Sequence, residues 1–233
     1  MRMYDTTFDT YRDASAVNQA MGRVYGHMSL AVVTSMIVSM FVGMTPELVE
    51  FFFTGIMKWV VIFAPLVAVF VVAPVLASNP TPSVAMAALH GFAALMGLSF
   101  AMIFVIFTMG SIFTAFMGAA VLFGTMSAYG YFTKQNLDSV GKYAFVALIA
   151  ICIASIVNIF IGSTVMQMVI SALAIIIFLA LTAYDTQTIR EMVSSENSTY
   201  GDEVSGALTL YLDFINIFIH LLQLFGIMNS KDD

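Results

Sequence analysis

The longest uncharged stretch of the chain runs from Trp59 to Thr133 and reads WVVIFAPLVAVFVVAPVLASNPTPSVAMAALHGFAALMGLSFAMIFVIFTMGSIFTAFMGAAVLFGTMSAYGYFT. It contains no Asp, Glu, Lys or Arg. A membrane-spanning helix needs about 20 predominantly apolar residues to cross ~30 Å of hydrocarbon, so this stretch is long enough for about three crossings with their turns. Residues 25–46 and 143–184 are also uncharged. We therefore expect a membrane protein with several spans.

The composition of the whole chain points the same way. Of its 233 residues, 61% are hydrophobic and 9% are charged, whereas about 25% of the residues of an average soluble domain are charged. This excludes a soluble globular domain and a disordered chain. The net charge of −6 leaves no basic face for a nucleic acid. The single cysteine, Cys152, excludes an internal disulfide, and the three histidines lie in separate spans, which argues against a zinc site.

Proline, glycine and polar residues divide the hydrophobic part of the chain into seven segments. The predicted spans are 25–43, 52–77, 84–108, 110–132, 143–162, 164–188 and 206–228. A polar N-terminal tail over residues 1–24 and a short C-terminal tail over 229–233 flank this transmembrane domain at 25–228. We expect the turn between the third and fourth spans at Met109-Gly110-Ser111. The fold class predicted is an all-α membrane protein, a seven-transmembrane-helix bundle.

The distribution of positive charge predicts the orientation of the bundle, because cytoplasmic loops carry an excess of Lys and Arg. With the N-terminus inside, the inner segments hold Arg2, Arg12, Arg23, Lys134, Lys142 and Arg190, and the outer segments hold Lys231. Lys58, near the outer end of the second span, is interpreted as a snorkelling anchor. We expect a cytoplasmic N-terminus and a C-terminus on the opposite side. The short tails and the lack of a targeting peptide favour a bacterial inner membrane.

Two carboxylates, Asp185 and Asp213, fall at membrane depth. They lie on antiparallel spans, about 7 Å and about 10 Å from the cytoplasmic end at 1.5 Å per residue. An isolated ionised carboxylate at such a depth costs at least a few kcal/mol, whereas two close carboxyls can share a proton. Without that proton they repel each other or bind a cation such as calcium, which prefers carboxylate oxygens. Asp185 and Asp213 are therefore a candidate pH-sensing and gating pair with transient calcium binding. The alternative is structural: Asp213 bonds across the bundle and Asp185 orients a helix end.

Polar side chains recur on one face of each of the last two spans. The seventh span carries Thr209, Asp213, Asn216, His220 and Gln223 at spacings of one helical turn, and the sixth carries Gln167, Ser171, Thr182 and Asp185 on one face. Because a polar stripe is not expected to face lipid, we expect the last helix to be central, with its stripe toward the sixth span. Thr209, Asn216, His220, Gln223, Thr182 and Ser171 are candidate pore residues.

Two further patterns have simpler interpretations. Met36, Met40 and Met44 form a ladder on the first span, which favours conformable packing over a soft-metal path. The acidic residues between the sixth and seventh spans are expected to form a solvated face, with a cation-concentrating pore mouth as the alternative. These acidic residues are Glu191, Glu196, Asp202 and Glu203.

The segments around the two aspartates resemble the paired signature of the Bax inhibitor-1 family. They read TAYDTQ over 182–187 and ALTLYLDFINIF over 207–218, and YGYFTK over 129–134 is also similar to that family's pattern. The resemblance implies a seven-helix bundle with the last helix central, and Asp185 and Asp213 as a pH-sensitive latch on a calcium leak path. Some members place an arginine of the second span against the pair. No basic residue stands at the inner end of that span here, so we expect a carboxyl–carboxylate latch without a salt bridge.

The leading hypothesis is therefore a pH-sensitive calcium leak channel without a cofactor, whose partners are the lipid bilayer and calcium. A regulatory protein that binds other membrane proteins, such as proteases or death regulators, is the alternative. An intramembrane aspartyl protease is a remote third. Tyr184-Asp185 fits half of its motif, but Leu210-Tyr211-Leu212-Asp213 lacks the glycines of Gly-x-Gly-Asp. We expect no enzymatic activity.

Overall fold

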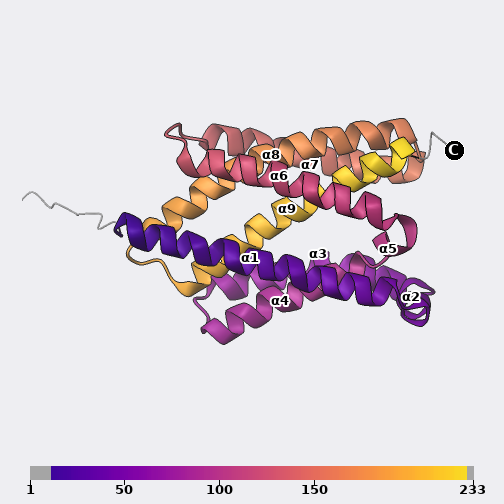
Figure 1. Ribbon diagram of the computed structural model, residues 1–233, viewed down its shortest axis with the longest axis horizontal. Coiled ribbons are helices and arrows are strands. Elements are labelled where there is room, and N and C mark those ends of the chain that lie inside the picture. The colour runs from indigo at the N-terminus through magenta and orange to yellow at the C-terminus, as the bar shows by residue number, and fades with distance from the viewer. Residues whose placement is uncertain (1–11, 230–233) are drawn as a thin grey trace, which may run out of the picture.

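The computed structural model describes residues 12–229, and this part of the chain is almost entirely helical (Figure 1). The helices are α1 (Ala14–Gly43), α2 (Pro46–Phe53), α3 (Met57–Ala77), α4 (Pro82–Ser99), α5 (Ile103–Ile106), α6 (Met109–Phe132), α7 (Asp138–Ile161), α8 (Thr164–Ser194) and α9 (Tyr200–Asn229). Seven segments are long and apolar enough to cross a membrane, namely α1, α3, α4 with α5, α6, α7, α8 and α9. The prediction of an all-α protein with seven spans is confirmed.

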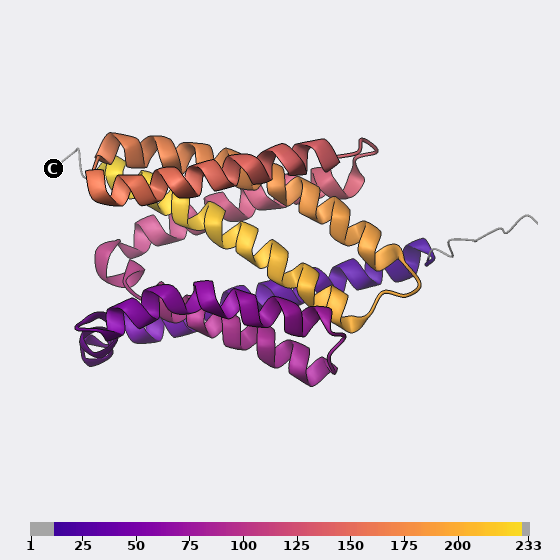
Figure 2. The same cartoon turned by 180° about the vertical axis from the view of Figure 1, so that it is seen from behind.

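The last helix occupies the centre of the bundle. Figures 1 and 2 show α9 running diagonally between one group formed by α1, α3 and α4 and another formed by α6, α7 and α8. It packs against α8, α6 and α1, and also against α3 and α4. Large side chains of α9 are fully buried in consequence, among them Leu210, Tyr211, Ile217 and Leu222. The predicted central position of the last helix is confirmed.

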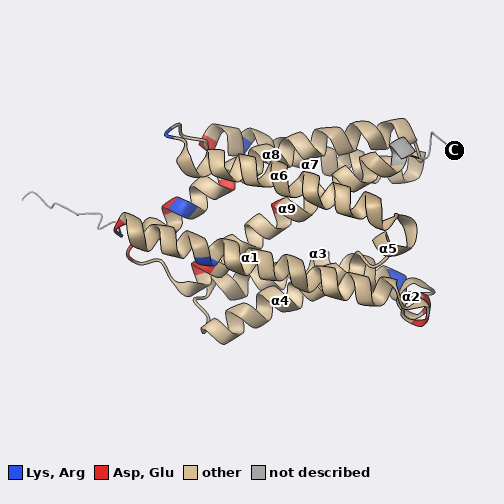
Figure 3. Cartoon of the chain, viewed as in Figure 1, with Lys and Arg blue, Asp and Glu red and all other residues tan. Residues whose placement is uncertain are grey.

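The outward faces of the other helices are apolar. Phe70 of α3 and Phe160 of α7 are 73% and 85% exposed, and many Val, Ile and Leu side chains beside them are exposed as well. A continuous apolar surface of this kind is a liability in water and suits contact with lipid. Charged residues gather toward the two ends of the helices, most of them at the end where α1 begins (Figure 3). The chain is a multi-pass integral membrane protein.

Several helix boundaries differ from the predicted ones. The expected polar tail 1–24 contains the start of α1, because Asp13 caps that helix and its Oδ1 accepts from the Ala16 N–H at 2.7 Å. The turn expected at Met109-Gly110-Ser111 is wrong. Thr108 caps α6, with its Oγ1 accepting from the Ser111 N–H at 3.2 Å, so these three residues form the first turn of α6. The chain reverses before them, between α5 and α6.

Residues 189–205, between the predicted sixth and seventh spans, are also mostly helical, since α8 continues to Ser194 and α9 begins at Tyr200. The interpretation of Glu203 as a solvated residue is wrong. Glu203 is 4% exposed and pairs with Arg23 of α1, with 2.6 Å from Nη2 to Oε1 and 2.7 Å from Nε to Oε2. Asp202 Oδ2 accepts from the Thr199 N–H at 2.8 Å at the start of α9. The early start of α1 explains the pairing, because it brings Arg23 beside the first turn of α9.

Candidate functional site

Asp185 of α8 and Asp213 of α9 meet where these two helices pack against each other. Their carboxyl groups are in hydrogen-bonding contact, and Asp213 is 4% exposed. At 1.5 Å per residue, Asp185 lies about 14 Å from the end of α8 and Asp213 about 20 Å from the start of α9. Both lie further from the ends of their helices than from the predicted span ends, because the two helices extend further toward the 195–199 loop. The structure thus brings together the two residues, here called the carboxyl pair.

The described residues leave one carboxyl oxygen of Asp213 without a hydrogen-bond donor. Oδ2 of Asp213 is buried and has no hydrogen-bond partner within the described residues. The Thr182 hydroxyl contacts Asp213, but it also lies 2.7 Å from the Phe178 carbonyl oxygen, and a hydroxyl has one hydrogen to donate. Among the described residues, Arg23 and Glu203 form an ion pair, whereas neither Asp185 nor Asp213 takes part in an ion pair. A proton held between the two carboxyls would supply such a donor.

Glycines of α6 and α7 approach α8 closely just before Asp185. The backbone of Gly130 in α6 lies directly against the Ala183 carbonyl, so a Cβ at this position would collide with it. On the α7 side, a Cβ at Gly141 would come within 2.5 Å of the Tyr184 ring. These close approaches fix the residues of α8 that immediately precede Asp185. On the other side of Asp185, the Thr186 hydroxyl lies 3.0 Å from Ser127 Oγ of α6.

A cavity of about 670 Å³ between α7, α8 and α9 reaches the carboxyl pair, and we call it the polar cavity. Asp138 and Lys142, near the start of α7, line its part toward the 195–199 loop, and Phe178 and Cys152 line its part deeper in the bundle. Its full lining is Asp138, Gly141, Lys142, Phe145, Leu148, Cys152, Phe178, Leu181, Tyr184, Asp185, Thr209, Leu212, Asp213 and Asn216. The carboxyl pair is therefore accessible from a cleft that carries charged residues at one end.

The remaining polar residues of the two stripes form a second group, here called the distal polar cluster. The Gln167 amide and the Ser171 hydroxyl donate to Gln223 Oε1 at 3.0 Å and 2.9 Å. His220 Nδ1 lies 3.4 Å from Ser171 Oγ, and the Asn158 amide donates to Gln167 at 3.2 Å. Ser171 is about 21 Å along α8 from Asp185 at 1.5 Å per residue. The cluster therefore lies toward the opposite end of the bundle.

An aromatic side chain separates the two polar groups. Phe178 lines the polar cavity, and its ring stacks on His220 with 6.4 Å between the centroids. It is 7% exposed. The stripe that appears continuous in the sequence is thus divided in space: Thr182, Thr209 and Asn216 lie with the carboxyl pair, and Ser171, His220 and Gln223 do not.

The contribution of α7 to the site is not predicted by the polar stripes of the sequence. Asp138, Lys142 and Cys152 line the polar cavity although the polar stripes lie on α8 and α9. The signal in the sequence was Gly141, a small residue between charged neighbours at the start of a span. Among the described residues, no group of three or more His, Cys, Asp or Glu side chains could hold a metal ion. A calcium ion at the pair would therefore need water or carbonyl oxygens as further ligands.

Comparison with known proteins shows which family the chain matches. Residues 17–230 match the family model described as inhibitor of apoptosis-promoting Bax1. The chain is 33% identical over 211 residues to the inner membrane protein YbhL of Escherichia coli K12, covering 88% of this chain and 90% of that protein. It is 39% identical over 172 residues to an uncharacterized protein of Deinococcus radiodurans, covering 72% and 73%. An uncharacterized membrane protein of Streptococcus pyogenes serotype M3 is 42% identical over 137 residues, 58% of this chain and 60% of that protein.

Proposed function

The chain belongs to the Bax inhibitor-1 family, and we propose that it is a pH-sensitive cation leak channel in which Asp185 and Asp213 form the gate. The observation that carries the proposal is the contact of two carboxyls, one of them 4% exposed, at a cavity with charged residues at its outer end. Ionisable residues inside a membrane are rare and mark ion or proton pathways. The family match supports a membrane protein of this fold. The proposed function rests on the geometry of the site.

The path begins at the start of α7. A cation attracted by Asp138 enters the polar cavity and meets the carboxyl pair beside Asn216 and Thr209. Beyond the pair, Phe178 closes the route toward the distal polar cluster. Passage requires this ring to move, after which the amide and hydroxyl oxygens around Gln223 offer the next ligands. In this proposal the leak is closed while Phe178 keeps this position.

The carboxyl pair supplies the pH sensitivity. Two carboxyls in contact are held together by a proton between them, and two carboxylates without it repel each other. When the proton leaves, either α8 and α9 separate at this point or a cation takes the place of the proton. Carboxylate oxygens are the ligands that calcium prefers, so calcium is the transported ion that we propose. Protonation and cation binding then compete at one site.

We also propose an orientation and a membrane for the protein. Four basic residues lie at the end of the bundle where α1 begins, namely Arg12, Lys134, Lys142 and Arg190. Lys58 lies at the other end, in the first turn of α3. Under the positive-inside rule, the end with α1 faces the cytoplasm. The polar cavity then opens toward the cytoplasm. YbhL is named an inner membrane protein, which supports a bacterial inner membrane for this chain.

Calcium flux into liposomes that contain the purified protein tests the gate. We expect the wild-type flux to depend on pH, and we expect Asp213→Asn and Asp185→Asn to remove that dependence. Asp202→Asn is the matched control, because Asp202 caps the start of α9 away from the pair. A pH profile that stays unchanged in both pair variants would overturn the proposal. It would favour the regulatory alternative, in which a bound membrane protein is retained without either carboxylate.

A second comparison tests the barrier. Phe178→Ala connects the polar cavity with the distal polar cluster, so we expect a higher calcium flux. Phe123→Ala is the control, since Phe123 is equally buried at 7% and lies outside the polar cavity. Equal flux in the two variants would place the barrier elsewhere and contradict the route through Phe178.

A further inference from the structure

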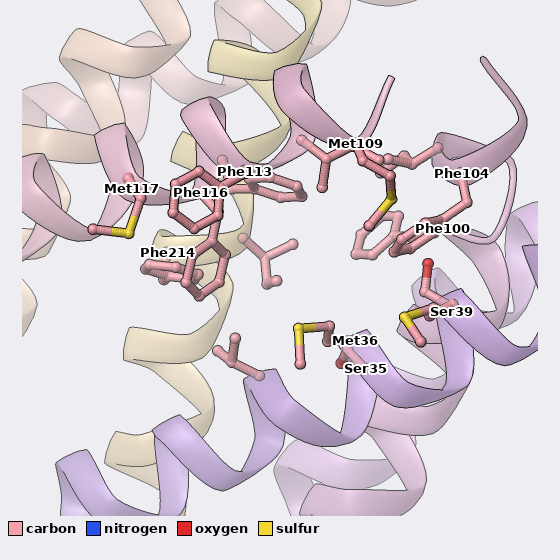
Figure 4. A pocket seen from close by; sticks show the side chains of 16 residues that line it. Ser35, Met36, Ser39, Phe100, Phe104, Met109, Phe113, Phe116, Met117 and Phe214 are labelled. Carbon is pink, nitrogen blue, oxygen red and sulfur yellow. The ribbon is translucent and has the colours of Figure 1, made fainter. Parts of the chain in front are cut away.

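A second cavity, of about 320 Å³, lies between α1, α6, α9 and the α4–α5 connection (Figure 4), and we call it the apolar cavity. Its lining is Val32, Ser35, Met36, Ser39, Met40, Phe100, Ile103, Phe104, Met109, Ile112, Phe113, Phe116, Met117, Phe214, Ile215 and Phe218. Its volume is in the range of ligand pockets, about 300–1,000 Å³. No charged residue of the described part of the chain lines the apolar cavity. The proposed ion path does not use it.

The two cavities lie on opposite sides of the central helix. At 3.6 residues per turn, Phe214, Ile215 and Phe218 face away from Asp213 and Asn216. The first three line the apolar cavity and the last two line the polar cavity. An occupant of the apolar cavity would therefore contact α9 directly behind the carboxyl pair.

The apolar cavity opens sideways, toward the lipid. Met36 of α1 and Phe113 of α6 are 49% and 67% exposed, and Met40, Met109 and Met117 at its edge are exposed as well. Methionine side chains are flexible and adapt to apolar surfaces of different shape. Two of the three methionines of the ladder on the first span, Met36 and Met40, thus border a hollow instead of filling a helix interface.

One polar group inside the apolar cavity has no hydrogen-bond partner among the described residues. Ser39 is 5% exposed, and its hydroxyl points into the cavity in Figure 4. It makes no hydrogen bond within the described part of the chain. By contrast, Ser35 is satisfied, because its hydroxyl lies 2.7 Å from the Ala93 carbonyl oxygen and 2.6 Å from Tyr211 Oη. An occupant with one hydrogen-bonding group beside an apolar body would satisfy Ser39.

The depth of the apolar cavity matches one leaflet of the bilayer. Ser39 lies about 6 Å from the end of α1 at Gly43, and Val32 lies about 16 Å from that end at 1.5 Å per residue. Half of the hydrocarbon core is about 15 Å thick. A fatty-acyl chain of the leaflet at this end of α1 would extend from Ser39 to Val32, with its ester carbonyl near the membrane interface. We propose that the apolar cavity holds one acyl chain of a membrane phospholipid, whose ester carbonyl accepts a hydrogen bond from Ser39.

Native mass spectrometry of the full chain, purified in mild detergent, tests the site. We expect a phospholipid to stay bound to the wild type and to be lost from Met36→Trp, which fills the cavity. Ile37→Trp is the matched control, since Ile37 is the neighbouring residue, is 60% exposed and does not line the cavity. Loss of the lipid from Met36→Trp alone supports the site. Equal retention in the two variants, or none in the wild type, overturns it.

A fluorescence measurement keeps the proposal testable if the filled variant does not fold. Trp59 is the single tryptophan, so Trp59→Phe gives a background for one reporter. In bilayers of phospholipids with brominated chains, Phe116→Trp in the apolar cavity should be strongly quenched. Phe123→Trp, on the same face of α6 but 7% exposed and outside the cavity, should be quenched much less. Equal quenching of the two reporters would overturn the proposal.

Discussion

Replacing Asp213 by Asn changes the charge of the carboxyl pair while keeping the shape of the side chain. Asp213 is 4% exposed, and its Oδ2 has no hydrogen-bond partner among the described residues. The amide group of the D213N variant would donate to the Asp185 carboxylate in place of the shared proton. We therefore expect D213N to be more stable than the wild type at alkaline pH, where the wild-type pair has lost its proton.

The size of the effect follows from the contact. Two unit charges about 4 Å apart repel by about 4 kcal/mol at an effective dielectric constant near 20. Separation of the helices and water in the polar cavity reduce this repulsion, and a buried acceptor without a donor costs about 1–3 kcal/mol. We expect D213N to gain ~1–3 kcal/mol in free energy of unfolding at alkaline pH. At acidic pH the wild-type pair has its proton, and the difference should fall below about 1 kcal/mol, the net worth of one hydrogen bond.

Unfolding of the purified protein in mixed detergent micelles, followed by circular dichroism in acidic and alkaline buffers, measures this difference. Glu191→Gln is the matched control, because it makes the corresponding change from carboxyl to amide at an exposed residue of α8 that does not line the polar cavity, and it should leave the pH dependence as in the wild type. A D213N variant that is less stable than the wild type at alkaline pH would refute the shared proton. A difference in free energy of unfolding between D213N and the wild type that is the same at both pH values would also refute it.

Two further predictions concern the packing that holds the site. Arg23→Ala leaves Glu203 buried without its partner and should lower the free energy of unfolding by ~1–3 kcal/mol, at the low side of broken buried pairs because the Arg23 side chain is 42% exposed. The double variant Arg23→Ala with Glu203→Gln should recover part of the loss in the same unfolding assay, and no recovery would contradict the pairing. Gly130→Ala collides with the Ala183 carbonyl and should cost about 1–3 kcal/mol, as overpacking does. Gly124→Ala, whose Cβ meets open space, should cost nothing measurable, and equal losses in the two variants would mean that α6 does not press on α8 at Gly130.

The number and approximate position of the spans could be predicted from the sequence because hydropathy is a local property. A segment such as 143–162 has nowhere to bury its apolar side chains except in lipid or in the bundle. The helix ends could not be predicted as well, since they depend on single capping residues. Asp13 and Thr108 begin α1 and α6 through one hydrogen bond each, and neither stands out from the other polar residues near it.

The two aspartates could be picked out from the sequence because charge is scarce at membrane depth, and their helical spacing indicated the faces that they share with Thr182 and Asn216. The role of Glu203 could not, because its burial depends on Arg23, a residue far away in the chain. The same holds for the contribution of α7 to the polar cavity. A stripe on one helix shows which residues face inward and says nothing about which neighbour faces them.

Composition and helical period therefore suffice to identify a seven-span membrane protein with an aspartate on each of its last two spans. Which of the stripe residues meet depends on how the helices cross in the folded bundle. Because α9 crosses the bundle diagonally, Asp213 contacts Asp185, whereas His220 and Gln223 pack around Ser171 beyond Phe178. The same crossing leaves a polar cavity on one side of α9 and an apolar cavity on the other. Helix crossing is set by contacts between residues distant in the chain, such as Gly130 with Ala183, and no local pattern encodes it.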